Sequence, residues 1–170
     1  MLLSLDIGFR FTGWSVFNKN MIIAYGCITT KKSKLKSART ADDDARCCAE
    51  IANQLTVIIK EYKVKAVIGE MPHGGAQSAR PNRTMALASG VTSAVAAVLN
   101  LPVSWTTPLQ VKLAATGRNK ADKEDVIKGI KEKFKYFKFE YSDETEFEHI
   151  ADSIGAYLAL KSDNLVIMYG

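Results

Sequence analysis

Short apolar runs separated by turn residues open the chain. Residues 2–8, 12–18 and 21–28 each gather aliphatic and aromatic side chains, with residues such as Gly8 and Asn20 between them. Runs of this length, bounded by turn residues, are typical of strands joined by tight connections. The pattern therefore predicts a meander of three antiparallel strands.

The apolar period changes in the middle of the chain. From Asp44 to Tyr62 apolar side chains recur at intervals of three and four residues, which predicts an amphipathic helix. The aspartates at 42–44 suit the positive N-terminal end of that helix. The β-branched run over 65–70 then predicts a fourth strand, and the Gly- and Pro-containing stretch 71–82 predicts a loop.

The second half of the chain reads mainly as helices. We expect a helix over 83–99, a strand over 103–105, and helices over 108–116, 122–134 and 146–160. Hairpin strands followed by alternating strands and helices indicate an α/β fold, with a mixed central sheet of about five strands, three antiparallel and then parallel, flanked by helices. The final VIMY is compatible with a last strand or a contact surface.

Bulk composition narrows the class of protein. The chain has 170 residues, is 47% hydrophobic and carries a net charge of +5. No linker divides it, so we expect one domain over residues 1–170. No apolar run approaches the ~20 residues of a membrane helix, and the start MLLSLDIG lacks the basic leader of a signal peptide. We expect a cytoplasmic protein without a membrane partner, and the positive charge is compatible with a polyanionic one.

The three cysteines do not suggest a metal site or a disulfide framework. Cys27, Cys47 and Cys48 lack metal-type spacing, and an odd number with one adjacent pair is a poor basis for disulfides. We expect them to be reduced core residues.

Three acids and one histidine fall in apolar surroundings. Asp6 lies inside the first strand, and Glu70 ends the strand over 65–70. His149 and Asp152 are three residues apart on a predicted helix, which places them side by side near its N-terminal end. Like charges in a low-dielectric setting need a proton or a cation, and oxygen-rich sites of this kind suit Mg²⁺ or Mn²⁺. The pattern indicates a divalent metal site, provided that the separate segments converge.

Each of these residues also has a purely structural interpretation. Asp6 is compatible with a turn residue at the end of a strand, and His149 with a core histidine. Glu70 is compatible with an ion pair to Arg80 or Arg83. Two further acids are alternatives if the helical register differs: Glu146 and Glu148.

Four motifs, in order, resemble the RuvC-type Holliday junction resolvases of the ribonuclease H-like superfamily. LSLDIGFRFTGWSVF is similar to the first hairpin of the family with its metal-binding aspartate, and AVIGEMP to the strand that carries the glutamate. TPLQVKLAATGRNKADKEDV resembles the Pro-x-x-Val-Lys…Thr-Gly…Ala-x-Lys stretch, and EHIADSIGAYLAL the closing helix. The resemblance covers most of the chain and implies a ribonuclease H-like nuclease.

The resemblance implies a set of roles for individual residues. The metal-binding catalytic set is Asp6, Glu70, His149 and Asp152, holding two Mg²⁺ or Mn²⁺ ions, with Lys112 and Lys123 close to the DNA. Hydrolysis of a phosphodiester leaves 5′-phosphate and 3′-hydroxyl ends. Where the family offers an aromatic wedge after the glutamate, this chain has only Met71 or His73 for that role, which leaves room for a phage- or virus-like member that also cuts forks or flaps.

DNA must also be held through its backbone. The candidates are the 31–39 segment, with its five positive charges, and the following residues: Arg80, Arg83, Lys112, Arg118, Lys120 and Lys123. Ala86, Gly90 and Ala94 repeat every fourth residue and form a small-residue face, which suits either packing within the chain or contact with a second copy. Two symmetric cuts in a four-way junction need two active sites, so the resemblance favours a homodimer. The sequence does not determine whether a helicase is a partner.

Three rival functions remain open at this stage. Sugar-kinase and actin-like ATPases open with a similar Asp-x-Gly hairpin, but they need two such domains, and this chain is long enough for one. An RNA-processing nuclease of the same superfamily is harder to separate, although the 108–123 motif favours DNA. A branched-DNA-binding protein that no longer cuts is disfavoured because all four metal-site residues are present.

Overall fold

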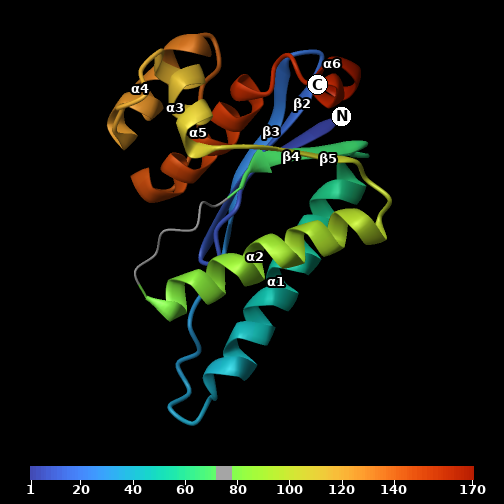
Figure 1. Ribbon diagram of the computed structural model, residues 1–170, viewed down its shortest axis with the longest axis vertical. Coiled ribbons are helices and arrows are strands. Elements are labelled where there is room, and N and C mark those ends of the chain that lie inside the picture. The colour runs from blue at the N-terminus through green and yellow to red at the C-terminus, as the bar shows by residue number, and fades with distance from the viewer. Residues whose placement is uncertain (72–77) are drawn as a thin grey trace.

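The computed structural model describes residues 1–71 and 78–170 and shows a central sheet with helices on both faces (Figure 1). The strands are β1 (Leu2–Asp6), β2 (Phe11–Asn18), β3 (Met21–Thr29), β4 (Ala66–Glu70) and β5 (Val103–Thr106). The helices are α1 (Thr40–Glu61), α2 (Ala79–Val98), α3 (Pro108–Thr116), α4 (Lys123–Lys133), α5 (Glu144–Ala159) and α6 (Asn164–Tyr169).

The five strands lie in the order β3-β2-β1-β4-β5. The first three are antiparallel neighbours, whereas β4 runs parallel to β1 and β5 parallel to β4. The predicted mixed sheet of three antiparallel and then parallel strands is therefore confirmed. β1 and β4 both end at the same edge of the sheet, where Asp6 is paired in register with Glu70.

The sheet separates two hydrophobic cores, and strand alternation decides which side chains enter each. Helices α1 and α2 cover one face, and α3, α4 and α5 the other (Figure 1). Leu3 and Leu5 of β1 belong to the core under α1 and α2, whereas Leu2 belongs to the core under α5. Because alternate residues of a strand share a face, Ser4 and Asp6 also point toward α5. The alternation of side chains along β1 therefore turns Asp6 toward α5.

Three helices begin earlier than the sequence predicted: α5 by two residues, and α1 and α2 by four. α1 begins at Thr40 and not Asp44, because a polar first turn precedes the periodic apolar residues. α2 begins at Ala79 and not Arg83, with Pro81 in its first turn, where a missing backbone N–H costs nothing.

The C-terminal segment is a helix and not a strand. Asp163 caps α6 by accepting a hydrogen bond from the N–H of Leu165. Among the cysteines, Cys47 alone is buried, while Cys27 and Cys48 are half-buried; all three are free thiols. The prediction of three core cysteines was thus wrong for two of them. Across 1–71 and 78–170, no helix is long and apolar enough to cross a bilayer.

Candidate active site

Four sequence-predicted side chains come together where β1 and β4 end beneath α5. Asp6 and Glu70 end neighbouring strands, and His149 and Asp152 lie one turn apart on the helix that packs over them. We call these four residues the acidic cluster. Asp6 is the last paired residue of β1, at the strand end that its structural interpretation required, but its carboxylate contacts His149 of α5.

One direct contact joins strand and helix within the acidic cluster. Nδ1 of His149 lies 2.6 Å from Oδ2 of Asp6, and the ring of Phe11 stacks on the imidazole at 5.2 Å. The side chain of His149 is 23% exposed and that of Asp6 is 16% exposed, so the contact between them is largely shielded from water. Burial disfavours a charged imidazole, but the hydrogen bond to Asp6 and nearby carboxylates outweigh it and raise the pKa of His149. The imidazole is held in place by a carboxylate and an aromatic ring.

The other two acids are strongly perturbed. Burial, followed by the charges of Asp6 and Asp152, raises the pKa of Glu70 to about 8, although Lys112 acts in the opposite direction. Burial, followed by the charges of Asp6 and Glu148, raises the pKa of Asp152 to about 7. Near neutral pH these carboxylates repel one another unless a proton or a cation is present.

The donor chemistry of the acidic cluster fits a divalent cation. Three carboxylates and an imidazole are ligands of hard or borderline metal ions, and a bound cation offsets both the burial and the repulsion that raise the two pKa values. Within the ranges 1–71 and 78–170, no three His, Cys, Asp or Glu side chains already stand in the geometry of a finished site. His149 engages only Oδ2 of Asp6, so the second carboxylate oxygen is left to face a cation.

We predict that the metal-free protein becomes less stable as pH rises. With a pKa of about 8 in the folded chain and 4.5 as its ordinary value, Glu70 holds its proton more tightly when folded. Between about pH 4.5 and 8 the folded state binds more protons than the unfolded state, so the free energy of unfolding falls with rising pH. We expect this pH-dependent fall in the free energy of unfolding to be on the order of 2 kcal/mol, since solvent partly screens the site, and to be absent in Glu70→Gln.

The measurement is urea unfolding in a chelator across that pH window. The exposed Glu61 offers a matched control, because Glu61→Gln should leave the pH slope unchanged. An identical slope in Glu70→Gln and wild type would contradict the assignment of a raised pKa to Glu70.

Close packing between α5 and the sheet positions the acidic cluster. Gly13 of β2 lies against the backbone of His149, where a Cβ atom would come within 1.9 Å of the carbonyl oxygen. A hydroxyl group reinforces the contact, because Ser4 of β1 donates to the carbonyl of Ser153 at 2.6 Å. Sequence reasoning missed both residues, although a buried serine and a glycine inside apolar strands were available signals.

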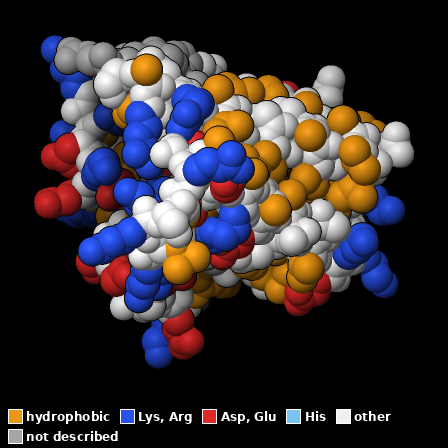
Figure 2. Space-filling model, turned by 90° about the horizontal axis from the view of Figure 1, so that it is seen from below, with side chains coloured by type: hydrophobic (Ala, Val, Ile, Leu, Met, Phe, Trp, Pro, Cys, Tyr) orange, Lys and Arg blue, Asp and Glu red, His pale blue; other side chains and the backbone are white. Residues whose placement is uncertain are grey.

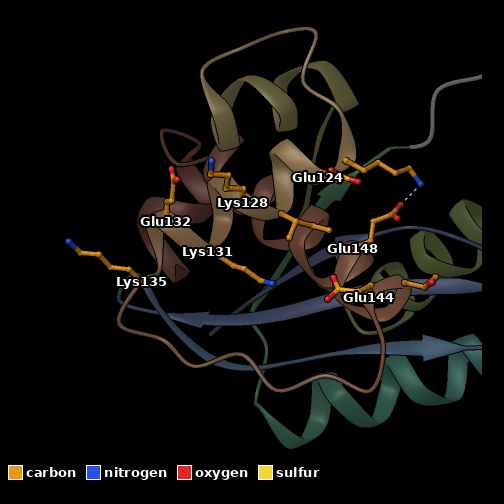
Figure 3. A pocket seen from close by; sticks show the side chains of 10 residues that line it. Glu124, Lys128, Lys131, Glu132, Lys135, Glu144 and Glu148 are labelled. Carbon is orange, nitrogen blue, oxygen red and sulfur yellow. Dashed lines mark hydrogen bonds and ion pairs between the residues drawn. The ribbon is translucent and has the colours of Figure 1, made fainter.

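Two lysines that the resemblance assigns to DNA lie beside the acidic cluster. Lys112 of α3 is half-buried and near enough to Glu70 to lower its pKa. Lys123, at the start of α4, forms an ion pair with Glu148, drawn as a dashed line in Figure 3. Glu148 is therefore the acid that adjoins the cluster, whereas Glu146 accepts a hydrogen bond from the N–H of Ser142, 2.9 Å away.

Release of Lys123 should strengthen DNA binding. Glu148 holds the ammonium group that a phosphate would otherwise attract, so Glu148→Gln frees one cation and removes one repelling charge. We expect junction affinity at ~0.1 M salt to rise about threefold. Glu132→Gln, at the opposite end of α4 from Lys123, is the charge-matched control in a gel shift, and equal affinities for the two variants would show that the ion pair does not restrain Lys123.

The other predicted DNA contacts differ in whether an acidic side chain already pairs with them. Arg118 is paired with Asp125 at 2.6 Å, and Arg83 with Asp44 at 2.6 Å, so Arg83 is not the partner of Glu70. Lys120 is exposed, and Arg80 lies beside the 31–39 segment. Two wedge candidates complete the set: Met71, half-buried with its N–H bonded to the carbonyl of Thr106, and His73, which lies outside the described residues.

The groove between α4 and the start of α5 is not a simple phosphate track. It encloses about 830 Å³, and its wall mixes charges of both signs along its length (Figure 3). Four lysines and four glutamates contribute: Lys123, Lys128, Lys131, Lys135, Glu124, Glu132, Glu144 and Glu148. Because the charges balance, this groove offers DNA little net attraction.

Sequence comparison relates the chain to one family of nucleases. The family model described as crossover junction endodeoxyribonuclease RuvC matches residues 2–156. The crossover junction endodeoxyribonuclease RuvC of Neisseria meningitidis is 34% identical over 131 residues, which cover 74% of this chain and 67% of that protein. The protein of the same name from Prochlorococcus marinus is 27% identical over 135 residues, covering 76% of this chain and 80% of its own.

Solved structures share the fold. T. thermophilus RuvC in complex with Holliday junction substrate superposes with a TM-score of 0.74 at 16% identity, covering 98% of this chain and 95% of that chain. The yeast mitochondrial Holliday junction resolvase gives a TM-score of 0.62 at 17% identity, with 93% and 76% covered. The predicted ribonuclease H-like fold is confirmed.

Proposed function

Because the chain belongs to the RuvC family of crossover junction endodeoxyribonucleases, we propose that the acidic cluster is the centre at which it hydrolyses the strands of four-way DNA. The protein is a structure-selective endonuclease that resolves Holliday junctions and depends on a divalent metal. In this proposal residues 1–170 act as one nuclease domain. The observation that carries it is the convergence of two half-buried acids of raised pKa with the Asp6–His149 pair.

Each member of the acidic cluster has a proposed role. Asp6, central to the cluster, would be shared between two ions, with Glu70 serving one and the His149–Asp152 pair the other. Mg²⁺, or Mn²⁺, supplies charge for the scissile phosphate, the attacking water and the leaving oxygen. The chain contributes position: Phe11 and Gly13 fix His149, and burial keeps the carboxylates away from bulk water. The proposed products carry 5′-phosphate ends.

The substrate is held by charge next to the acidic cluster. Lys112 and Lys123 border it from α3 and α4, and their contacts are with phosphates, which fix orientation without reading sequence. The proposed substrates are four-way junctions and, because no aromatic wedge follows Glu70 in the sequence, also forks and flaps.

A panel of labelled substrates tests the proposed function. The purified protein is incubated with a four-way junction, a fork, a linear duplex and a structured RNA, each with Mg²⁺ or Mn²⁺. We expect cutting of the junction and fork with little cutting of the duplex. Absence of cutting in every reaction would refute the nuclease, and preferential cutting of RNA would point to an RNA-processing enzyme instead.

We also propose a homodimer through the outer face of α2. Ala86, Gly90 and Ala94 are all exposed, and among the described residues no atom beyond the adjacent helix backbone lies within 4 Å of a Cβ built on Gly90. Val98 on the same helix is 80% exposed. Seen from below, this side of the molecule shows a broad area of hydrophobic and uncharged side chains (Figure 2). A second copy that covers the small-residue face would place two acidic clusters on one junction.

Substitution in the small-residue face should separate the copies. Ala94→Arg places a long charged side chain where two helices would meet, so we expect the dimer dissociation constant to rise at least tenfold (~1.4 kcal/mol). Sedimentation velocity measures it, with Val57→Arg on the exposed side of α1 as the control. Dimers of equal strength in Ala94→Arg and the control would exclude this interface.

A further inference from the structure

We propose that the loop between β3 and α1, together with Arg80 of α2, grips the backbone of a duplex arm away from the site of cutting. The basic loop is residues 31–39. This inference rests on the proposed function for its substrate, branched DNA, and adds a second contact surface to it. It also predicts that affinity depends on the length of the junction arms.

The basic loop concentrates unpaired positive charge. Lys31, Lys32, Lys34 and Lys36 are exposed, and none of them forms an ion pair within residues 1–71 and 78–170. Three of these lysines line a hollow of about 250 Å³ that Arg80 closes from the α2 side. Like charges held this close repel one another, and a polyanion relieves the repulsion.

Neighbouring acids do not neutralise these lysines. Asp43, only 6% exposed, lies 2.8 Å from Arg46, and Asp44, also 6% exposed, lies 2.6 Å from Arg83. Asp42 pairs with Arg39 at the end of the basic loop. Each of the three acids at the start of α1 therefore already has an arginine partner, and the lysines remain available to a ligand.

The base of the basic loop is fixed to α1. The N–H of Ser33 donates to Oδ1 of Asp43 at 3.0 Å, and Arg46 donates to the carbonyl of Lys31. A turn closes the other end, where the N–H of Ala38 donates to the carbonyl of Leu35 at 3.1 Å. A loop ordered before binding loses less conformational entropy when it meets its ligand, so its charges are more effective.

The position of the basic loop selects the part of the substrate that it would meet. The loop lies at the N-terminal end of α1, well below the ends of β1 and β4 (Figure 1). From below, Lys and Arg side chains gather on one side of the molecule (Figure 2). Phosphates recur along a duplex at regular intervals, so lysines remote from the cut still find backbone on an arm that is long enough. Lysines act there as point charges and do not read bases.

Two charge-matched triple variants test the inference. One removes the loop charges by Lys32→Gln, Lys34→Gln and Lys36→Gln; the other removes three charges near the opposite end of α1 by Lys60→Gln, Lys63→Gln and Lys65→Gln. Binding to four-way junctions with short and long arms is measured in a chelator over a range of salt, so that no cutting occurs. Thermal melts check that both variants fold.

The loop variant should lose affinity only when the arms are long. We expect at least a tenfold loss on long arms at ~0.1 M salt and a slope of log K against log[salt] that is shallower by about 2 to 3. On short arms its affinity should match that of the control variant. Equal losses for loop and control variants, or equal losses on short and long arms, would overturn the inference. Because binding is read without metal, failure of the protein to cut DNA would refute the proposed function and leave this comparison intact.

Discussion

Asp6→Asn and Glu70→Gln are each expected to lower the rate of junction cleavage on the order of 10³-fold or more while leaving junction binding nearly unchanged. Each change preserves the size of the side chain and removes one negative charge from the acidic cluster, where charge is needed to hold the divalent cation. Asp6 is paired with Glu70 in register and bonded to His149, so it is central to the cluster. We expect binding to persist because the proposed phosphate contacts are lysines and not acids.

Single-turnover cleavage measures the rate, and a gel shift on the same junction measures binding. Glu61→Gln repeats the chemical change on the exposed surface of α1 and should cut at the wild-type rate. A cut rate in Asp6→Asn within tenfold of wild type would show that the cation is held elsewhere. Loss of binding in a folded Glu70→Gln would show that the acid has a role in substrate binding that we have not assigned.

We expect Gly13→Ala to be the most destabilising single substitution near the site. It should lower the free energy of unfolding by about 3 kcal/mol or more and also reduce the rate of cleavage. Its Cβ would lie 1.9 Å from the carbonyl oxygen and 2.3 Å from the carbonyl carbon of His149. Both are backbone atoms of α5, so the whole helix has to move away from β2. His149 and Asp152 would move with the helix, and the acidic cluster would open.

Gly26→Ala is the matched control for this prediction. It adds the same methyl group to the neighbouring strand, but its nearest contacts, at 2.8 to 3.1 Å, are ring atoms of the Trp14 side chain, which can shift. Urea unfolding should therefore show a much smaller loss for Gly26→Ala. If Gly13→Ala unfolds like Gly26→Ala and cuts at the wild-type rate, close approach of α5 to β2 does not position the site.

The sequence was a good guide to the strands and to the members of the acidic cluster. Asp6 and Glu70 stand out because a carboxylate inside a buried strand is costly without a partner. His149 and Asp152 stand out because helical spacing puts them on one side of an otherwise apolar helix. What periodicity does not contain is register between distant segments, so the pairing of Asp6 with Glu70 became known only from the sheet.

The partners of charged residues were beyond the reach of the sequence for a similar reason. Arg83 was a candidate for Glu70 or for DNA, but it binds Asp44, which is distant in sequence and brought close by the crossing of α1 and α2. Lys123 was predicted to lie close to the DNA, but its partner in the folded chain, Glu148, was considered only as a substitute ligand. Charge pairs of this kind depend on tertiary packing and leave no local pattern.

For the basic loop, the sequence predicted the charge but not the order of the backbone. Its five positive charges are evident in the sequence, where they read as a solvated segment. Its ordering is not evident, because the group that fixes it, Asp43, was assigned only to the helix N-terminus. A composition-based interpretation therefore found the charge and missed the geometry that would make it useful.

Asp152→Asn, in a single experiment that reads binding and cutting together, is the sharpest test of the acidic cluster. Burial, followed by the charges of Asp6 and Glu148, raises the pKa of Asp152 to about 7. With a labelled four-way junction and Mg²⁺, we predict paired cuts bearing 5′-phosphates by wild type, and a junction that Asp152→Asn binds equally well and leaves intact. Cutting by Asp152→Asn at the wild-type rate would contradict hydrolysis at the acidic cluster.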